Sequence, residues 1–284
     1  MDADKPSRSF LEIVKECAAS ERLKLPVFPE VALELHQLLA DPDVSVGQVA
    51  KAICKDQGLT TQIMKLANSG FYRGIKGVRT VDDAIFRLGM NNVFNHVVAI
   101  KQGNYYRSSN PLMDTFLKVS FTHAICTATG SQWLAPRIGY QRLSNAAFLA
   151  GLLHDIGKLL IIKVIESLIS ICKSLPLTDA FISDTIVSLH AEFGHTLMRE
   201  WGILDEYCKV ARYHHVDEFD TSDALLMTVR VANQACVKYG VNTISERQID
   251  LRSLKEVQIL GIKEDVVDEL ENVIASAIEL HRSG

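Results

Sequence analysis

Residues 151–158 read Gly-Leu-Leu-His-Asp-Ile-Gly-Lys and place an adjacent His154 and Asp155 in an otherwise apolar run. The surrounding stretch, 148–165, is strongly apolar, but His154, Asp155, Lys158 and Lys163 interrupt it. A bilayer-spanning helix needs about 20 predominantly apolar residues with few or no charges, so this stretch predicts the interior of a globular protein. A buried imidazole or carboxylate is costly unless it is paired. We therefore expect His154 and Asp155 to have polar partners elsewhere in the chain.

Further histidines lie on the apolar faces of predicted helices. In the helix expected over 111–135, His123 takes the place of an apolar residue in a stripe spaced alternately by four and three residues, as on one buried helix face. In the helix expected over 178–201, His190 lies on the stripe with Ile186 and Phe193. His195 is five residues further on and is therefore turned about 140° away from His190.

Two later segments repeat the pattern. His214 shares a face with Tyr207 and Val210 in 204–215, and Asn233 interrupts the apolar stripe of 222–239. His215 is displaced by about 100° from His214 around a helix. A metal ion can satisfy several buried imidazoles and a carboxylate together, so the convergence of these groups predicts a metal site. The alternative is a hydrogen-bonded polar core without metal.

The period of the whole sequence is helical, and no alternating strand pattern of useful length is present. The sequence therefore predicts an all-α fold. Asn110-Pro111 is a favourable helix start after a polar segment, and we expect a boundary there. The expected parts are an N-terminal helix in 1–24, a helical part in 25–108, a second helical part in 109–239 that carries the site, and a helical extension in 240–284.

Composition excludes several classes of protein. The chain has 284 residues, 48% of them hydrophobic and 23% charged, which excludes a disordered chain. Its net charge of −4 provides no general basic field for a phosphate backbone, so we expect no nucleic-acid partner. The six cysteines contain no Cys-x-x-Cys pair, and residues 1–8 are not followed by an apolar signal segment. We expect a cytoplasmic protein with no membrane partner.

The motif containing His154-Asp155, preceded by His123 on a long helix, resembles the HD superfamily of metal-dependent phosphohydrolases. Residues 25–90 sharpen this resemblance, because they look like the HDOD domain of bacterial signalling proteins. The matching features are Leu25-Pro26 with Pro29, Asp41-Pro42, the run 56–59, Leu66-Ala67-Asn68-Ser69, and Ala84-Ile85 with Leu88-Gly89. The resemblance covers about residues 20–235.

The resemblance implies a site that holds one or two divalent ions, with iron, manganese, zinc or nickel as candidates. Asn233 stands where the superfamily has an aspartate, and this exchange removes a negative charge. The Gly-Tyr-Pro triplet of the cyclic-di-nucleotide phosphodiesterase branch is absent after His215. The implied metal ligands are His123, His154, Asp155, His190, His214, His215 and Asn233.

Two functions follow from this resemblance. The first is a regulatory HDOD module that binds a signalling protein. The second is a metal-dependent phosphohydrolase acting on a phosphorylated small molecule, in which Asp155 bridges the metals and a metal-activated water attacks phosphorus. Lys158 would then neutralise phosphate oxygens, although it could equally be a solvated helix lysine. Metal binding and catalysis are separable, so a site that holds metal need not turn over a substrate.

Overall fold

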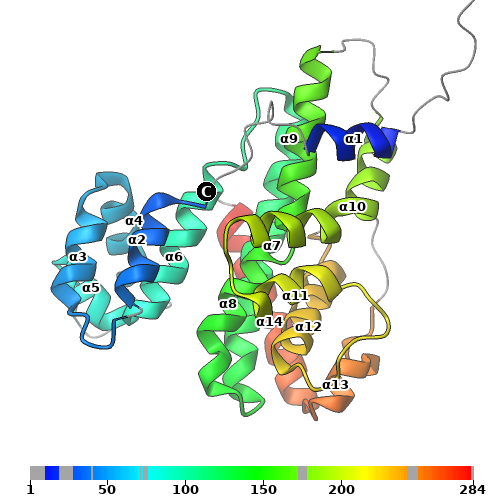
Figure 1. Cartoon of the computed structure of the whole chain (residues 1–284). Coiled ribbons are helices and arrows are strands. Elements are labelled where there is room, and N and C mark those ends of the chain that lie inside the picture. Colours follow the sequence, from blue (N-terminus) through cyan, green and yellow to red (C-terminus); the bar gives the residue numbers. More distant parts are fainter. Residues whose placement is uncertain are drawn as a thin grey trace, which may run out of the picture. The chain divides into compact units, whose positions relative to one another are not determined.

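The structure is a computed structural model that describes residues 10–18, 28–39, 41–70, 72, 76–171, 178–241 and 249–282 (Figure 1). Within these ranges the chain forms α-helices and two short 3-10 helices and contains no β-strand. The predicted all-α fold is confirmed. None of the helices in these ranges combines the length and the hydropathy that a bilayer-spanning segment needs.

Two compact units divide the chain, one of residues 27–105 and one of residues 1–26 with 106–284. We call them the N-terminal unit and the C-terminal unit. The N-terminal unit contains α2 (Glu30–Leu39), α3 (Val46–Cys54), α4 (Gln57–Ala67), α5 (Val81–Leu88) and α6 (Met90–Gly103). The C-terminal unit contains α1 (Phe10–Ala18), α7 (Pro111–Arg137), η1 (Gln141–Leu143), α8 (Ser144–Leu153), α9 (Ile156–Ile171), α10 (Asp179–Glu200), α11 (Asp205–Tyr213), α12 (Ala224–Lys238), η2 (Leu251–Ser253), α13 (Lys255–Ile259) and α14 (Glu264–Arg282).

The helices of the N-terminal unit begin at capping residues. Ser45 and Gln48 form a reciprocal capping box at the start of α3, with distances of 3.3 Å and 2.9 Å between the paired atoms. The Thr80 hydroxyl accepts the backbone N–H of Asp83 at the start of α5. These side chains satisfy N–H groups that the first turn of a helix leaves unpaired. The apolar faces that follow form a core that includes Leu35, Ile53, Leu59, Ile63 and Ile85.

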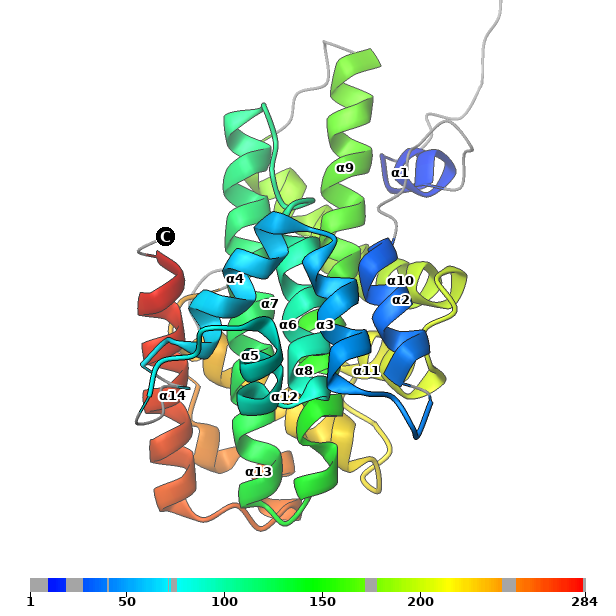
Figure 2. The ribbon, with the colours of Figure 1, turned by 90° about the vertical axis from the view of Figure 1, so that its left-hand side faces the viewer.

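The long helix α7 organises the C-terminal unit. It begins at Pro111, and the Asn110 side chain accepts the N–H groups of Leu112 and Met113. Its 27 residues extend about 40 Å at 1.5 Å per residue. Helices α8, α9, α12 and α14 all contact α7 (Figures 1 and 2), so α7 is the common neighbour of these four helices.

Glycines bring two helix pairs into backbone contact. A Cβ atom on Gly151 would lie 2.8 Å from the Cα of Ala128, where α8 crosses α7. A Cβ atom on Gly157 would lie 1.9 Å from the carbonyl oxygen of His190 and 2.6 Å from the backbone nitrogen of Gly194, where α9 crosses α10. Any larger residue would force these helices apart. The two glycines that flank His154-Asp155 therefore hold that pair close to α7 on one side and to α10 on the other.

Candidate metal centre

His154 and Asp155 lie at the junction between two helices. His154 is the C-cap of α8, and α9 begins one residue after Asp155. The two side chains are 0% and 2% exposed, respectively. Asp155 is therefore a buried carboxylate at the centre of the C-terminal unit, and the groups around it determine its chemistry.

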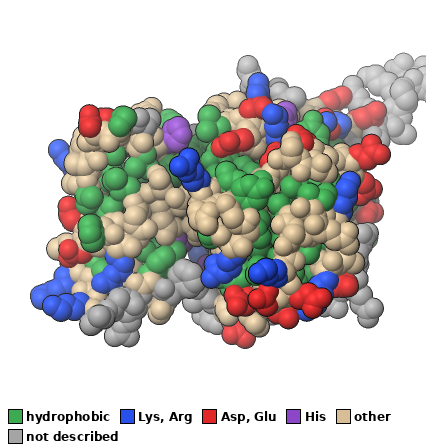
Figure 3. Space-filling view, turned by 90° about the horizontal axis from the view of Figure 1, so that it is seen from below, with side chains coloured by type: hydrophobic (Ala, Val, Ile, Leu, Met, Phe, Trp, Pro, Cys, Tyr) green, Lys and Arg blue, Asp and Glu red, His purple; other side chains and the backbone are tan. Residues whose placement is uncertain are grey.

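Four imidazoles from four different helices or helix ends converge on the Asp155 carboxylate. The Nε2 atoms of His123 on α7 and His154 lie 3.3 Å and 3.2 Å from Oδ2. The Nε2 atoms of His190 on α10 and His214, the C-cap of α11, lie 3.4 Å and 3.3 Å from Oδ1. All four rings are almost fully buried, and histidine takes up little of the molecular face in Figure 3.

Backbone carbonyl groups hold the outer nitrogen of each of these rings. The partners of Nδ1 are Val241 O for His123 (2.5 Å), Gly151 O for His154 (2.7 Å), Ile186 O for His190 (2.8 Å) and Ala211 O for His214 (2.9 Å). A carbonyl oxygen can only accept, so each Nδ1 carries a hydrogen in a neutral ring and each Nε2 keeps a lone pair. The four lone pairs are therefore directed inward, the arrangement found around metal-bound histidines.

Among the residues that the structure describes, none donates a hydrogen bond to the Asp155 oxygens or to His154 Nε2, and these three atoms are buried. The Lys158 ammonium, which is also buried, lies 2.6 Å from Oδ2 but without the alignment of a hydrogen bond. Unpaired buried acceptors carry a full desolvation penalty. A divalent cation among these atoms removes that penalty, so the donor set fits a metal ion.

Protonation does not supply the missing positive charge. Burial, with a smaller effect of the Lys158 charge on His123, lowers the pKa of both His123 and His190 to about 3. Burial also lowers the pKa of His214. Desolvation would raise the pKa of Asp155, but the interactions with His154, the Lys158 ammonium and His214 outweigh it and keep that pKa well below its usual value. At neutral pH the Asp155 carboxylate is therefore anionic, and His123, His190 and His214 beside it are neutral.

These residues form two groups that share Asp155. The four-ligand group comprises Asp155 with His190, His214 and His215, and the three-ligand group comprises Asp155 with His123 and His154. His215 is the exposed member, and its ring centroid lies 5.1 Å from that of His190. His215 therefore connects the buried centre to solvent.

Other predicted site residues lie as follows. Lys158, on the first turn of α9, contacts Asp155 and is not a solvated helix lysine. Asn233 is buried on α12, a helix that contacts α7 and α8, and its side-chain nitrogen has no hydrogen-bond partner within the described part of the chain. His195, expected to face away from His190, is outside both ligand groups.

Sequence reasoning missed Arg230, which supports the turn that carries His214 and His215. Its guanidinium donates to the carbonyl oxygens of Tyr213 and Val216, at 3.0 Å and 2.9 Å, which flank the two histidines. Buried Glu256 pairs with its Nε atom. The signal available in the sequence was an arginine within the apolar run of 222–239, but its partners are set only by folding. We infer that Arg230 orients the double histidine.

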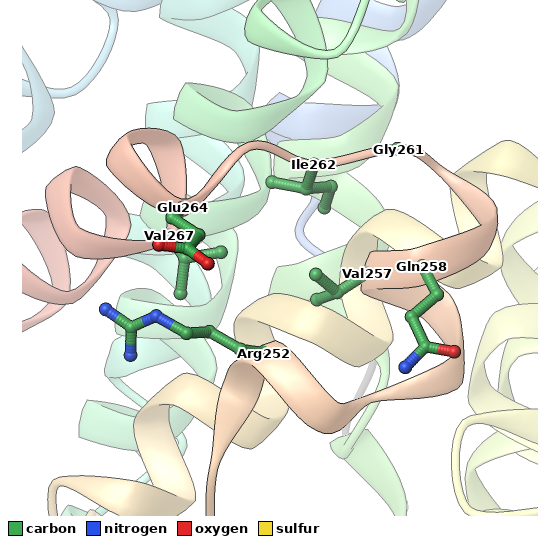
Figure 4. A pocket seen from close by; sticks show the side chains of 7 residues that line it. All are labelled: Arg252, Val257, Gln258, Gly261, Ile262, Glu264 and Val267. Atoms are coloured by element: carbon green, nitrogen blue, oxygen red, sulfur yellow. The ribbon is translucent and has the colours of Figure 1, made fainter.

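A separate surface hollow does not take part in this centre. It is lined by Arg252, Val257, Gln258, Gly261, Ile262, Glu264 and Val267, where η2 and α13 meet α14 (Figure 4). Its lining contains no histidine, and Arg252 is already paired with Asp268. This hollow therefore adds no candidate ligand to the buried cluster.

The helical architecture and the His/Asp cluster around Asp155 define a protein of the HD class. The HDOD domain matches residues 25–216, more than half of the chain. The chain belongs to the HDOD family.

The chain is also similar to known proteins. An uncharacterized protein of Treponema pallidum (strain Nichols) is 27% identical over 201 residues, which are 67% of this chain and 37% of that protein. An HDOD domain protein of unknown function from Geobacter sulfurreducens is 21% identical with a TM-score of 0.75, over 95% of this chain and 96% of that one. A candidate phosphohydrolase from Shewanella amazonensis SB2B is 25% identical with a TM-score of 0.62, over 96% of each chain.

Proposed function

We propose that this chain is a regulatory HDOD module that binds a divalent metal ion in its C-terminal unit. The observation that carries the proposal is the set of four buried imidazoles whose Nδ1 atoms are held by carbonyl groups and whose Nε2 atoms surround one carboxylate. A cation is the partner that the inward Nε2 lone pairs of this set require. The candidate ligands are the members of the two ligand groups, with Asn233 as a neutral candidate beyond them.

Burial supports a regulatory role over catalysis. Among the described members of the two ligand groups, only His215 is exposed, so these residues leave a substrate little access to Asp155. We propose a signalling protein as the partner, in keeping with the family, and a cytoplasmic location. Cys54, Cys126, Cys208 and Cys236 are free thiols, which suits a reducing compartment.

A metal-dependent phosphohydrolase is the second candidate, and two observations favour it. Asp155 presents one oxygen to each ligand group, as a bridging carboxylate does, and the Lys158 ammonium lies beside it. A bound divalent ion supplies Lewis acidity and positive charge to such a site. Lys158 would add a point charge for a phosphate oxygen. The similarity to a candidate phosphohydrolase of Shewanella amazonensis SB2B is consistent with this alternative.

One experiment tests the metal claim and separates the two functions. The full chain is purified without a metal-affinity column, and its content of iron, manganese, zinc and nickel is measured by mass spectrometry. Hydrolysis of p-nitrophenyl phosphate and bis(p-nitrophenyl) phosphate is then measured with each metal added. Asp155→Asn is the inactive comparison, and His195→Ala, a histidine of α10 outside both ligand groups, is the matched control.

We expect metal in the wild-type protein and in His195→Ala, little in Asp155→Asn, and no hydrolysis above the Asp155→Asn background. Hydrolysis that requires metal and is lost in Asp155→Asn would establish the phosphohydrolase instead. A wild-type protein that neither retains nor takes up any of these metals would refute the proposed centre.

A further inference from the structure

The two ligand groups around Asp155 are unequal, and the difference bears on how many ions they hold. In the four-ligand group, Asp155 Oδ1 lies 3.4 Å from His190 Nε2 and 3.3 Å from His214 Nε2. The two Nε2 atoms lie 3.3 Å apart. These three ligand atoms form a nearly equilateral triangle before any ion is present.

That triangle matches one face of a tetrahedron. Ligand bonds of about 2.0–2.1 Å at tetrahedral angles place ligand atoms about 3.3–3.4 Å apart, whereas the same bonds at right angles give about 2.8–3.0 Å. His215 supplies a further ligand atom within 4.8 Å of the other three. The spacing of Asp155 Oδ1, His190 Nε2 and His214 Nε2 therefore suits three ligands of a tetrahedral ion such as zinc, and His215, on the solvent side, is the candidate for the fourth.

Lys158 lies beside the three-ligand group. Its ammonium lies 2.6 Å from Oδ2, the same oxygen that His123 and His154 approach. Among the residues of the two ligand groups, Asp155 is the only carboxylate. A second divalent ion on Oδ2 would place like charges side by side in a buried site that has a single negative charge to offset them, and such uncompensated burial of charge is strongly unfavourable.

We infer that the centre holds one four-coordinate divalent ion, bound by Asp155, His190, His214 and His215, and that the Lys158 ammonium takes the place of a second ion at the three-ligand group. This inference rests on the proposed metal-binding function. Four protein ligands close the coordination sphere, as in structural zinc sites, so the inference also explains why a metal-bearing HDOD module would not be a hydrolase.

The test measures zinc stoichiometry in the full chain. Protein stripped with a chelator is reloaded with excess zinc and desalted, and zinc per chain is determined by mass spectrometry. We expect one equivalent in the wild type and in His123→Ala, and a loss of most of it in His190→Ala and His215→Ala. Cobalt substitution should give the intense visible absorption of four-coordinate Co²⁺, and His215→Ala should abolish it.

Lys158→Met removes the charge but keeps the length of the side chain, and it should raise the zinc content from one equivalent towards two. His215 is exposed, so His215→Ala is expected to fold, and helical circular dichroism verifies this for every variant. His195→Ala should bind as the wild type does.

Two results would overturn the inference while leaving metal binding intact. One is two equivalents of zinc in the wild type. The other is an ion that His123→Ala loses and His215→Ala retains. Absence of zinc binding in the folded wild type would instead refute the proposed function itself, so the two failures are distinguishable.

Discussion

Replacing Gly157 by alanine should damage both the stability of the C-terminal unit and its metal centre. The new Cβ atom would lie 1.9 Å from the carbonyl oxygen of His190 and 2.6 Å from the backbone nitrogen of Gly194. Both are backbone atoms, so no rotamer change relieves the contact. Since ordinary contacts of a Cβ atom begin near 3.4 Å, α9 and α10 must separate by about 1.5 Å.

The structure sets the size of the effect. Overpacking a core commonly costs about 1–3 kcal/mol, and a clash with backbone belongs at the upper end. Alanine recovers about 0.5–1 kcal/mol of helix propensity over glycine, which leaves a net loss of about 2–2.5 kcal/mol. The same displacement carries His190 Nε2, now 3.4 Å from Asp155 Oδ1, beyond the separation that two ligands of one ion can have.

Urea denaturation of the metal-free protein measures the free energy of unfolding, and competition with a coloured zinc chelator measures the affinity for zinc. Gly194→Ala is the graded comparison, because its Cβ atom would lie 3.2 Å from the Gly157 nitrogen and should cost less. Gly47→Ala is the control, since its Cβ atom would meet nothing within 4 Å. If Gly157→Ala unfolds at the same urea concentration as the wild type and binds zinc equally well, the packing argument is wrong.

Three further predictions concern the surroundings of the centre. Arg230→Met removes the ion-pair partner of the buried Glu256 and should lower the free energy of unfolding by about 3–5 kcal/mol. Arg137→Met, at a half-exposed ion pair, should lower it by at most about 1 kcal/mol. Equal losses of the two variants in urea denaturation would contradict the role of Arg230 in supporting the turn of His214 and His215. Asn233→Asp buries an added carboxylate and should destabilise the metal-free protein by about 2–5 kcal/mol, seen as a lower Tm. Added zinc should restore part of that loss. An unchanged Tm without metal would show that this position is solvated. Chelation should lower the Tm of the wild type, and zinc restored to 100 times its Kd should return about 2.7 kcal/mol, whereas Asp155→Asn should melt at the same temperature with and without zinc.

Helix positions were predictable because the signals are local. The capping box of Ser45 and Gln48 and the Asn110-Pro111 start of α7 each lie within four residues of sequence. Periodicity also indicated the inward faces of His123 and His190, since a helix converts spacing into direction. Both side chains are 1–2% exposed in the structure.

The assembly of the centre depended on contacts that spacing does not encode. His123 Nδ1 pairs with a carbonyl group 118 residues away, at Val241, and any residue type can offer that carbonyl. Lys158 could be a solvated lysine or a charge in the site, and only the packing of α9 decides in favour of Asp155. The role of Gly157 likewise depends on which backbone crosses it. Nothing local distinguishes these residues.

The C-terminal unit is formed by two segments that are far apart in the sequence, residues 1–26 and 106–284, and this affects how it folds during synthesis on the ribosome. Helix α1 groups with residues 106–284 and packs against α9, and Lys15 pairs with Glu192 across 177 residues. At about 5–20 residues per second, translation reaches the partners of α1 roughly ten seconds or more after α1 itself. The N-terminal unit, residues 27–105, is translated in between and contains all of its own helices. The buried Val14 of α1 is therefore exposed apolar surface on the nascent chain until α9 and α10 have been translated, and α1 can reach its native contacts only after that point.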